Sequence, residues 1–431
     1  MRLTGRSGDK GDDVSESYSW LLGVDWGNAT HEVCLLDAQG QVVGTRSVPH
    51  TAEAVRDATQ WVCEQTGAEP AAIAVAIETP RGVLVDALIE QGFAVFALNP
   101  KQLDRFRDRY TTAGAKDDGR DAHVLGDALR TDRRAFRRVR PDDPLTIQLR
   151  EVCHLREELR EEESRLVNRL REQLYRVDAA WLRISPAADE PWLWTVLADA
   201  PDPVQWGQLA RRPLAVALRA HRIRRVTVED ILHALRQPRL RVADGVTEAV
   251  AFRIRALVRQ LLLVHDQRTT TERQIDRLLE RLGTEESTEG EPREHRDVEI
   301  LRSLPGVGRM VAATMLTEAT AALADRDYGM LRSYSGTAPV TKRSGKRTFF
   351  VQMRYACKRR LRAALYHWSR VSVQQDQAAR TYYAALRARG HTHARALRSV
   401  ADRWLRILVA MLKARQVYDS SRFRKVETVG P

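Results

Sequence analysis

The chain contains 431 residues, enough for two or three domains that each have a hydrophobic core. Lys and Arg total 70 against 57 Asp and Glu, so the formal net charge is +13. This excess favours a polyanionic partner such as nucleic acid, because each phosphate that is neutralised releases condensed counterions. An arginine-rich composition without any such role is the alternative on charge alone.

Cysteine spacing and hydropathy exclude several classes of protein. The four cysteines form no C-x-x-C pair, which argues against a zinc knuckle or a disulfide framework and suits a reducing compartment. No apolar segment reaches transmembrane length, and residues 1–18 predict a polar, disordered tail without the apolar segment of a secretory signal. We therefore expect a cytoplasmic protein with no membrane partner.

Residues 19–142 predict an α/β domain with a mixed sheet and helices on its faces. Its first apolar strand ends at Asp25, and a later, more apolar strand ends at Glu78. The expected elements are a strand at 21–25, a hairpin with strands at 33–36 and 41–43, a helix at 52–65, a strand at 72–77, a helix at 83–91 and a strand at 94–98, which Pro100 terminates.

Residues 143–284 predict a coiled-coil region with two antiparallel helical arms. Apolar residues recur every three, four or seven positions, and in the second arm Arg268 and Thr271 fill polar gaps in the apolar frame. Dimerisation through the arms and pairing of the arms within one chain fit this spacing equally well. Residues 181–249, rich in Pro, Arg and Trp, form an insertion with no assigned function. An acidic linker at 285–295, a basic helical domain at 296–420 and a tail at 421–431 complete the chain.

Four acids form the candidate metal site. Neighbouring strand ends of a twisted sheet can bring Asp25 and Glu78 to one rim, and Asp118 and Asp121, three residues apart, share one face of a predicted helix. Like charges this close need a cation. Oxygen ligands suit Mg²⁺ or Mn²⁺, and four carboxylates can hold two such ions about 4 Å apart for phosphoryl transfer. Asp118 and Asp121 also suit a helix N-terminus without metal, and Asp117 competes with Asp118 because it too shares a face with Asp121.

Two C-terminal motifs predict contacts to nucleic acid. A Leu-Pro-Gly-Val-Gly turn containing Gly306 and Gly308 resembles a helix-hairpin-helix turn, whose backbone N–H groups approach a phosphate; an ordinary helix-helix turn is the alternative. Ser344, in a basic loop, is a candidate hydroxyl nucleophile, although most serines in such loops only contact phosphate. The basic residues expected to contact nucleic acid are Lys342, Arg343, Lys346 and Arg347 around Ser344, and Lys358 and Arg359 in a basic amphipathic helix predicted at 355–368.

Taken together, these motifs resemble the DEDD transposases of the insertion-sequence family numbered one hundred and ten, which are also similar to Piv-type DNA invertases. Each motif is weak alone, but their order and spacing over most of the chain are specific. The matching segments are Gly23-Val24-Asp25, Ile77-Glu78-Thr79, the stretch from Lys116 to Ala122, Leu304-Pro305-Gly306-Val307-Gly308, Gly336-Thr337-Ala338-Pro339, Arg343-Ser344-Gly345 and the segment from Tyr382 to Gly390.

The resemblance implies an RNase H/RuvC-like N-terminal domain, a helical coiled-coil linker and a mainly α C-terminal transposase domain. It implies that Asp25, Glu78, Asp118 and Asp121 bind divalent metal and that Ser344 forms a covalent phosphoserine link to DNA. Members of this family also use a structured non-coding RNA, a bridge RNA from the ends of the element, to choose donor and target DNA. The resemblance further implies a composite active site, with acids and serine from different subunits, in a dimer or tetramer.

The chain departs from the family pattern at two places. Asp117 stands where family members usually have a small polar residue, and the insertion 181–249 is longer than a minimal member requires. Three other functions are compatible with the residues. They are a RuvC-like nuclease in which water replaces Ser344 as the nucleophile, a DNA invertase that needs no RNA, and an inactive nucleic-acid-binding scaffold.

Overall fold

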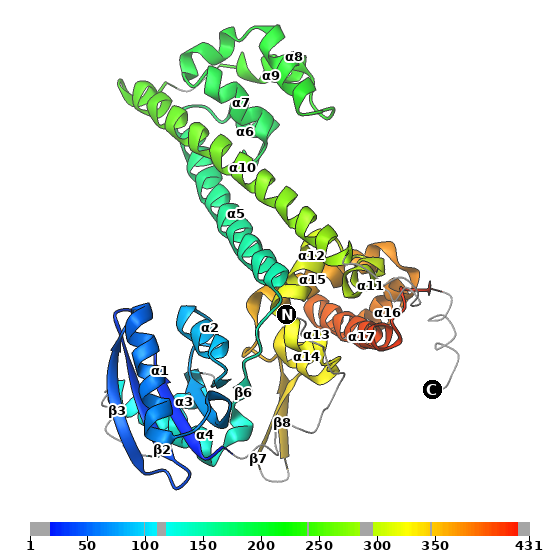
Figure 1. The fold of residues 1–431 in the computed structure, drawn as a ribbon. Helices are drawn as coiled ribbons and strands as arrows, with labels where there is room; N and C mark the ends of the chain where they lie inside the picture. Colours follow the sequence, from blue (N-terminus) through cyan, green and yellow to red (C-terminus); the bar gives the residue numbers. More distant parts are fainter. Residues whose placement is uncertain are drawn as a thin grey trace. The chain divides into compact units, whose positions relative to one another are not determined.

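The computed structural model describes residues 18–98, 100–109, 118–238, 241–284, 296–344 and 347–420; of residues 100, 101, 118, 284, 341–344 and 347–352 it describes only the backbone (Figure 1). Residues 1–17 of the predicted N-terminal tail, the predicted linker 285–295 and the predicted tail 421–431 lie outside the described residues. The chain divides into two compact units, residues 1–142 and residues 143–431.

The first unit contains a mixed sheet, as the sequence predicts. Within the described residues its strand order is β3-β2-β1-β4-β5-β6. The β1–β4 and β4–β5 pairs are parallel, whereas β2, β3 and β6 run antiparallel to their neighbours. The strands are β1 (Trp20–Asp25), β2 (Thr30–Asp37), β3 (Val42–Pro49), β4 (Ile73–Ile77), β5 (Ala94–Ala97) and β6 (Arg137–Arg138).

Helices cover both faces of this sheet. One face packs against α1 and α2, and the other against α3 and α4 (Figure 1). Strand alternation sorts the side chains: Val24 of β1 belongs to the core beneath α1 and α2, whereas Ala76 of β4 belongs to the core beneath α3 and α4. The helices are α1 (Ala52–Thr66), α2 (Val83–Glu90), α3 (Pro100–Arg107) and α4 (Asp118–Thr131), with short 3₁₀ turns η2 (Pro70–Ala72) and η3 (Arg133–Ala135).

Helix α3 was not expected from the sequence. Pro100 was interpreted only as the end of the preceding strand, but it is also the first residue of α3. Proline suits that position for two reasons. The first residue of a helix makes no N–H hydrogen bond within the helix, and the φ of proline, fixed at about −65°, is already helical. Leu103 and Phe106, the apolar residues of α3, pack on the sheet. The helix ends at Arg107.

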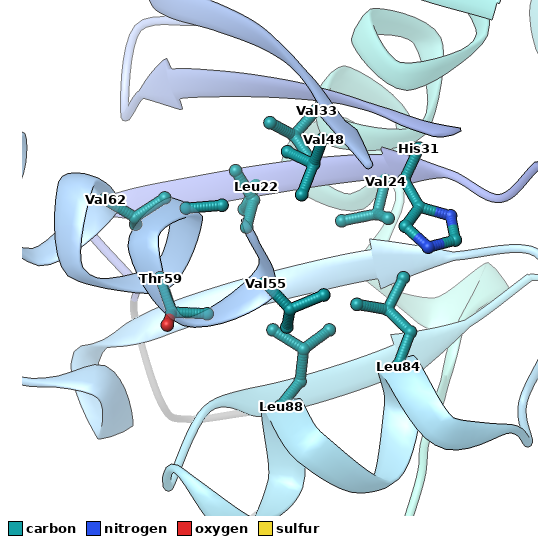
Figure 2. A pocket seen from close by; sticks show the side chains of 11 residues that line it. Leu22, Val24, His31, Val33, Val48, Val55, Thr59, Val62, Leu84 and Leu88 are labelled. Carbon is teal, nitrogen blue, oxygen red and sulfur yellow. The ribbon is translucent and has the colours of Figure 1, made fainter. Parts of the chain in front are cut away.

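A small cavity lies under the α1/α2 face of the sheet. It holds about 20 Å³ and is lined mainly by aliphatic side chains, with His31 at one end (Figure 2). The fully buried His31 ring accepts a hydrogen bond from the Gly27 N–H at Nδ1, so its Nε2 donates to Nδ1 of His50. Burial, followed by the charge of His50, lowers the pKa of His31. Space for about one water molecule is too small for a substrate site.

The second unit begins with two long helices that pack along one another. These are α5 (Pro144–Val177) and α10 (Val246–Thr284), and they pair within one chain (Figure 1). Leu149, Leu170 and Leu261 are fully buried along the arm. Thr271, a polar residue in this frame, is buried and donates its hydroxyl hydrogen to the Gln267 carbonyl at 2.7 Å.

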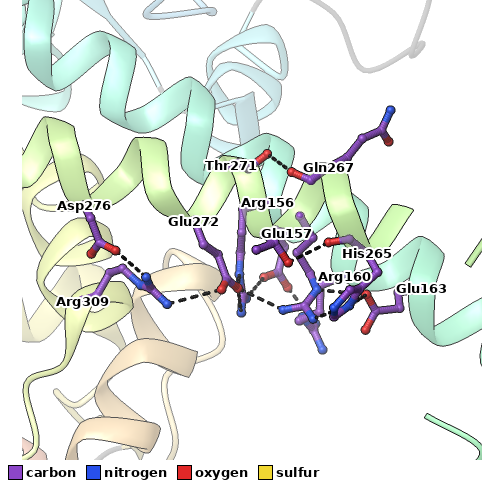
Figure 3. A network of polar contacts seen from close by, with 12 residues as sticks. Arg156, Glu157, Arg160, Glu163, His265, Gln267, Thr271, Glu272, Asp276 and Arg309 are labelled. Carbon is purple, nitrogen blue, oxygen red and sulfur yellow. Dashed lines mark hydrogen bonds and ion pairs between the residues drawn. The ribbon is translucent and has the colours of Figure 1, made fainter. Parts of the chain in front are cut away.

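A polar layer crosses the arm near its base (Figure 3). Glu272 of α10 accepts hydrogen bonds from Arg156 of α5 at 3.1 Å, from Arg268 at 3.0 Å and from Arg309 of α12 at 3.3 Å. Arg268 also donates to Glu163 of α5 at 3.0 Å. The layer therefore joins both arm helices to the C-terminal helices, and it favours one register because a shift would separate half-buried opposite charges.

The insertion between the arm helices is a small helical domain. Its core is built on Trp181, Trp192, Trp194 and Trp206, all fully buried against the distal ends of α5 and α10. The Nε1–H groups of Trp194 and Trp206 donate to the carbonyls of Ala188 and Ala200. The elements are α6 (Ala180–Ile184), α7 (Pro191–Asp199), η4 (Pro203–Gln208), α8 (Arg211–Ala220) and α9 (Val228–Leu235). We call residues 178–245 the arm-tip domain.

The C-terminal region is mostly helical, but it contains a hairpin that the sequence analysis missed. Strand β7 pairs antiparallel with β8, and the helix predicted at 355–368 begins instead at Arg359. The elements are α11 (Asp297–Ser303), α12 (Arg309–Glu318), α13 (Thr320–Ala324), α14 (Tyr328–Ser335), β7 (Val340–Ser344), β8 (Arg347–Gln352), α15 (Arg359–Gln375), α16 (Gln377–Ala388) and α17 (His393–Ala414). In the described part of the chain, every helix is too short or too polar to cross a membrane.

Replacing Glu272 should destabilise the second unit. In Glu272→Ala three arginines keep their charges but lose their shared carboxylate, so the free energy of unfolding should fall by about 1–3 kcal/mol. Urea unfolding followed by helical circular dichroism measures this change. Glu162→Ala is the control, because its ion pair with Arg165 is exposed and such pairs contribute about 0–1 kcal/mol. Equal losses in the two variants would contradict a stabilising polar layer.

Candidate functional site

Two of the predicted acids lie at neighbouring ends of parallel strands. Asp25 is the last residue of β1, and Glu78 directly follows β4. Because Val24 is paired with Ile77 in the parallel β1–β4 ladder, the two acids stand side by side in the register. Side chains alternate between the two faces of a strand, so Asp25 is on the same face as Leu21 and Gly23, which is the face toward α4. Asp25 and Glu78 are both half-buried.

Helix α4 reaches the acids because it lies very close to β1. A Cβ atom on Gly23 would stand 1.8 Å from the Ala122 carbonyl oxygen and 2.7 Å from the Gly126 nitrogen. Only glycine therefore allows this contact. The contact brings Asp121, the residue before Ala122, to the strand ends, where it is only 5% exposed.

Asp121 is held by an arginine that the sequence analysis did not single out. Nε of Arg107 donates to one carboxylate oxygen of Asp121 and Nη2 to the other, both at 2.6 Å. Nη1 of the same guanidinium donates to Asp104 at 2.7 Å. Partial burial lowers the pKa of Arg107, but the hydrogen bonds and charge of Asp121, followed by the charges of Asp104 and Glu78, raise it overall. The guanidinium thus lies within electrostatic reach of Glu78 as well.

The remaining acids of the predicted site are only partly described. Asp118 begins α4, three residues before Asp121, but its side chain lies outside the described residues, as does all of Asp117. The choice between them therefore stays a prediction. Among the described residues, no group of three or more acidic, histidine or cysteine side chains is arranged to hold a metal ion. In this conformation Asp121 is paired with Arg107 rather than grouped with Asp25 and Glu78.

Ser344 lies on a strand and not in the loop that was predicted. It is the last residue of β7, and its partner across the hairpin is Arg347. The ladder shifts register between Lys342 and Arg343, which is the mark of a bulge. The side chains of these residues, and the whole of Lys346, lie outside the described part of the chain. The serine therefore ends a strand of a hairpin that also carries Lys342, Arg343 and Arg347.

The Leu-Pro-Gly-Val-Gly turn joins α11 to α12, and its two glycines have different surroundings. Gly306 has a φ of +83° and packs on α15, where an added Cβ would stand 2.7 Å from the Ser372 nitrogen. Its N–H donates to the side chain of Gln375 at 2.9 Å, and the Trp368 ring donates to the Pro305 carbonyl. Gly308 caps α12, and an added Cβ there would meet nothing within 4 Å. The N–H of Gly306 is thus already bonded within the protein.

The two predicted basic residues at the start of α15 also differ. Lys358 precedes the helix, and its ammonium group lies 3.7 Å from the buried carboxylate of Glu318 and over the Tyr334 ring. The Glu318 carboxylate also lies 3.4 Å from Nε2 of His154 and 3.9 Å from Nη1 of Arg360. Arg359 is exposed. Arg359 therefore presents its charge to solvent, whereas the ammonium group of Lys358 contacts Glu318 and Tyr334 inside the protein.

Comparison with known proteins matches both parts of the chain. A family model described as a transposase covers residues 22–177, and a model of the transposase IS116/IS110/IS902 family covers residues 298–384. The chain is 30% identical over 418 residues to the mini-circle putative transposase for IS117 of Streptomyces coelicolor, covering 94% of this chain and 97% of that protein.

The chain belongs to the IS110 family of transposases. It is also 28% identical over 412 residues to the IS110 uncharacterized 43.6 kDa protein of S. coelicolor, covering 94% of this chain and 97% of that protein. Identity reaches 43% over 218 residues with the putative transposase y4uE of Sinorhizobium fredii, but that match covers 50% of this chain and 61% of the relative. DNA is therefore the substrate of this protein.

Both segments matched to the IS110 family carry predicted site residues. Asp25, Glu78 and Asp121 lie in the first segment, and Gly306 and Ser344 lie in the second. Residues 178–297, which include the arm-tip domain, lie outside both matched segments. Asp25 and Glu78 are predictable from their places at strand ends. Arg107 is not, because its partner Asp121 lies 14 residues away across a segment without a regular apolar pattern.

Removing Arg107 from this IS110-family transposase should destabilise the first unit. Arg107→Ala leaves the buried Asp121 carboxylate without its bidentate partner, so the free energy of opening of α4 should fall by about 2–4 kcal/mol. Hydrogen exchange of α4 peptides, measured by mass spectrometry, reports that energy. Arg130→Ala is the control, since its more exposed pair with Asp127 lies within the same helix. The double variant Arg107→Ala/Asp121→Asn should recover part of the loss; no recovery would contradict the role of the pair.

Gly306→Ala and Gly308→Ala should separate packing from surface roles in the turn. The first adds a Cβ against the backbone of α15 at positive φ and should lower the free energy of unfolding by about 2–4 kcal/mol. The second, at a φ of −85° in open space, should change it by less than about 1 kcal/mol. Urea unfolding of the two variants checks the difference, and equal stabilities would show that the turn packs otherwise.

Proposed function

We propose that this transposase cuts, exchanges and rejoins DNA strands through a covalent phosphoserine intermediate, with divalent metal bound by Asp25, Glu78, Asp118 and Asp121. The observation that carries the proposal is the juxtaposition of Asp25 and Glu78 at adjacent parallel strand ends, on the sheet face where α4 brings in Asp121. Like charges at adjacent strand ends repel one another, and a bound cation would offset that repulsion.

The donor chemistry suits Mg²⁺ or Mn²⁺. Carboxylate oxygens are the ligands these ions prefer, and a bound ion would stabilise negative charge that develops on the reacting phosphate. Asp25 and Glu78 offer carboxylates of this kind at neighbouring strand ends. Asp121 fits a ligand role after one exchange, because both of its oxygens accept hydrogen bonds from Arg107. Without metal, Arg107 compensates the negative charge of Asp121. For Asp121 to bind a metal ion, the Arg107 side chain has to move away from its carboxylate.

Ser344 is the proposed nucleophile. Its hydroxyl oxygen attacks the phosphorus of a phosphodiester and loses its proton to solvent or a neighbouring base, while the bond from phosphorus to one sugar oxygen breaks and that oxygen leaves as a hydroxyl. One P–O bond replaces another, so no oxidant or other energy source is needed. Attack by a sugar hydroxyl from a second strand reverses the step, rejoins the DNA and restores the serine.

Further parts of the proposal rest on the family resemblance. They are an RNase H/RuvC-like fold for the first unit, a helix-hairpin-helix role for the 304–308 turn, a guide RNA from the ends of the element, and a dimer or tetramer with composite sites. The proposed DNA-contacting residues are Gly306, Gly308, Lys342, Arg343, Lys346, Arg347, Lys358 and Arg359. The structure favours Arg359 over Lys358 and Gly308 over Gly306, because Lys358 and the Gly306 N–H have partners inside the protein.

A covalent adduct on denaturing gels tests the serine. The purified chain is incubated with Mg²⁺, labelled DNA carrying the sequences that flank its gene, and RNA transcribed from the same flanks. We expect a protein–DNA adduct with the unaltered chain, none with Ser344→Ala, and an unchanged amount with Thr341→Ala, which removes another hydroxyl from the same strand. Cleavage by Ser344→Ala without an adduct would instead assign the attack to water.

Metal binding tests the acids separately from the serine. Titration of Mn²⁺, followed by electron paramagnetic resonance, should give at least tenfold weaker binding in Asp25→Ala and Glu78→Ala than in the unaltered chain. Asp118→Asn and Asp117→Asn, compared in the same titration, decide between the two adjacent acids. Full recombination by Asp25→Ala and Glu78→Ala would refute the metal site. Sequencing of RNA that co-purifies with the chain tests guidance: a discrete species matching DNA beside the gene supports it, and only heterogeneous cellular RNA counts against it.

A further inference from the structure

The arm-tip domain carries a segment with strongly biased charge. Residues 203–228 contain six arginines and no Asp or Glu. Two of these arginines are neutralised by acids from outside the segment: Arg211 pairs with Glu229 at 2.7 Å, and Arg225 pairs with Glu190. The uneven charge is therefore concentrated on the other arginines, which lie on α8 and on the turn that follows it.

Those arginines line an open groove. Arg219, Arg222 and Arg224 are exposed around a floor of Leu218 and Ile223, with Thr227 at the start of α9. Among the residues that the structure describes, no carboxylate lies within ion-pair distance of these three guanidinium groups. An unneutralised cluster of guanidinium groups is the surface that recognises phosphate, because each offers several N–H donors in a planar fork.

The backbone at Arg222 points to a role for its side chain. This residue ends α8 in the left-handed conformation, with a φ of +54°. The Ile223 N–H donates to the Leu218 carbonyl at 2.8 Å, which is the pattern of a helix C-terminus that glycine normally completes. An L-residue there costs about 1 kcal/mol relative to glycine. The backbone conformation alone would favour glycine, so the arginine at this position suggests a function for its guanidinium.

The groove is far from the proposed chemistry along the arm. Helix α5 has 34 residues, and a rise of 1.5 Å per residue makes it about 50 Å long. Its start packs on α12 of the C-terminal region, and its end packs on the core of the arm-tip domain. About 50 Å corresponds to about 15 base pairs of duplex DNA at 3.4 Å per base pair. A surface at this distance from the C-terminal region reaches DNA beside the bonds being exchanged there.

We propose that Arg219, Arg222 and Arg224 bind the phosphate backbone of duplex DNA that flanks the exchange site. The inference rests on the proposed function, because it places strand exchange at Ser344 in the C-terminal region, whereas duplex binding by these arginines can be measured without that chemistry. Contacts of this kind add affinity and orientation without reading sequence. The arm-tip domain would thus hold the flanking duplex while the rest of the chain acts on the reacting strands.

The salt dependence of DNA binding tests the proposal. Fluorescence anisotropy gives the Kd of the full chain for a labelled 60-base-pair duplex of mixed sequence over a range of NaCl concentrations. Each phosphate contact contributes about 0.9 to the slope of log K against log salt, so Arg219→Gln/Arg222→Gly/Arg224→Gln should lower the slope by about 3. Affinity near 0.1 M salt should fall by about 10- to 100-fold. An unchanged slope would overturn the proposal.

Single variants keep the test free of folding defects. Arg222→Gly removes one guanidinium and supplies the residue that the turn favours, so its thermal stability should be equal or higher while the slope falls by about 1. Arg211→Gln on the same helix is the matched control and should leave the slope unchanged, because Arg211 already has a partner in Glu229. The same titrations with a single-stranded RNA separate the ligands: a loss of RNA binding with DNA binding intact would overturn the assignment to DNA.

Discussion

The close approach of helix α4 to strand β1 is the constraint on which the acidic site depends. The helix backbone touches the strand at Gly23, where any side chain would collide with the Ala122 carbonyl. This contact sets the depth of Asp121, and thereby the need for a positive partner in the absence of metal. Strand pairing alone accounts for Asp25 and Glu78. Helix α4 brings Asp121 to the same face of the sheet only because residue 23 has no Cβ.

Charge is handled in opposite ways in the two units. In the first unit, Arg107 neutralises Asp121, a buried acid that the proposed metal site needs. Metal binding would replace this ion pair with a bond from Asp121 to the metal ion. In the arm, Glu272 joins Arg156, Arg268 and Arg309 in a fixed layer between helices. Burial makes both arrangements costly to break, but only the first stands beside other acids at strand ends.

The sequence predicted the fold best where apolar periodicity is long. Both arm helices and the central strands of the sheet follow from spacing, and Asp25 and Glu78 follow from their places after apolar strands. Short elements could not be predicted in this way. Helix α3 has only eight residues, and β7 has five residues of which only Val340 is apolar, so neither leaves an apolar pattern. Arg107 was missed for a further reason: a partner for Asp121 is defined by packing of α3 on α4, which no local pattern encodes.

The arm has a consequence for how this chain can change over time. Helix α5 leaves the C-terminal region and α10 returns to it, so both ends of the arm-tip domain are attached at the far end of one helical pair. Gain, loss or exchange of that domain leaves the polar layer at the arm base and the sheet untouched. The region between the two family-matched segments is therefore a natural place for divergence among relatives. The affinity for flanking DNA can change there without mutations near the acids or the serine.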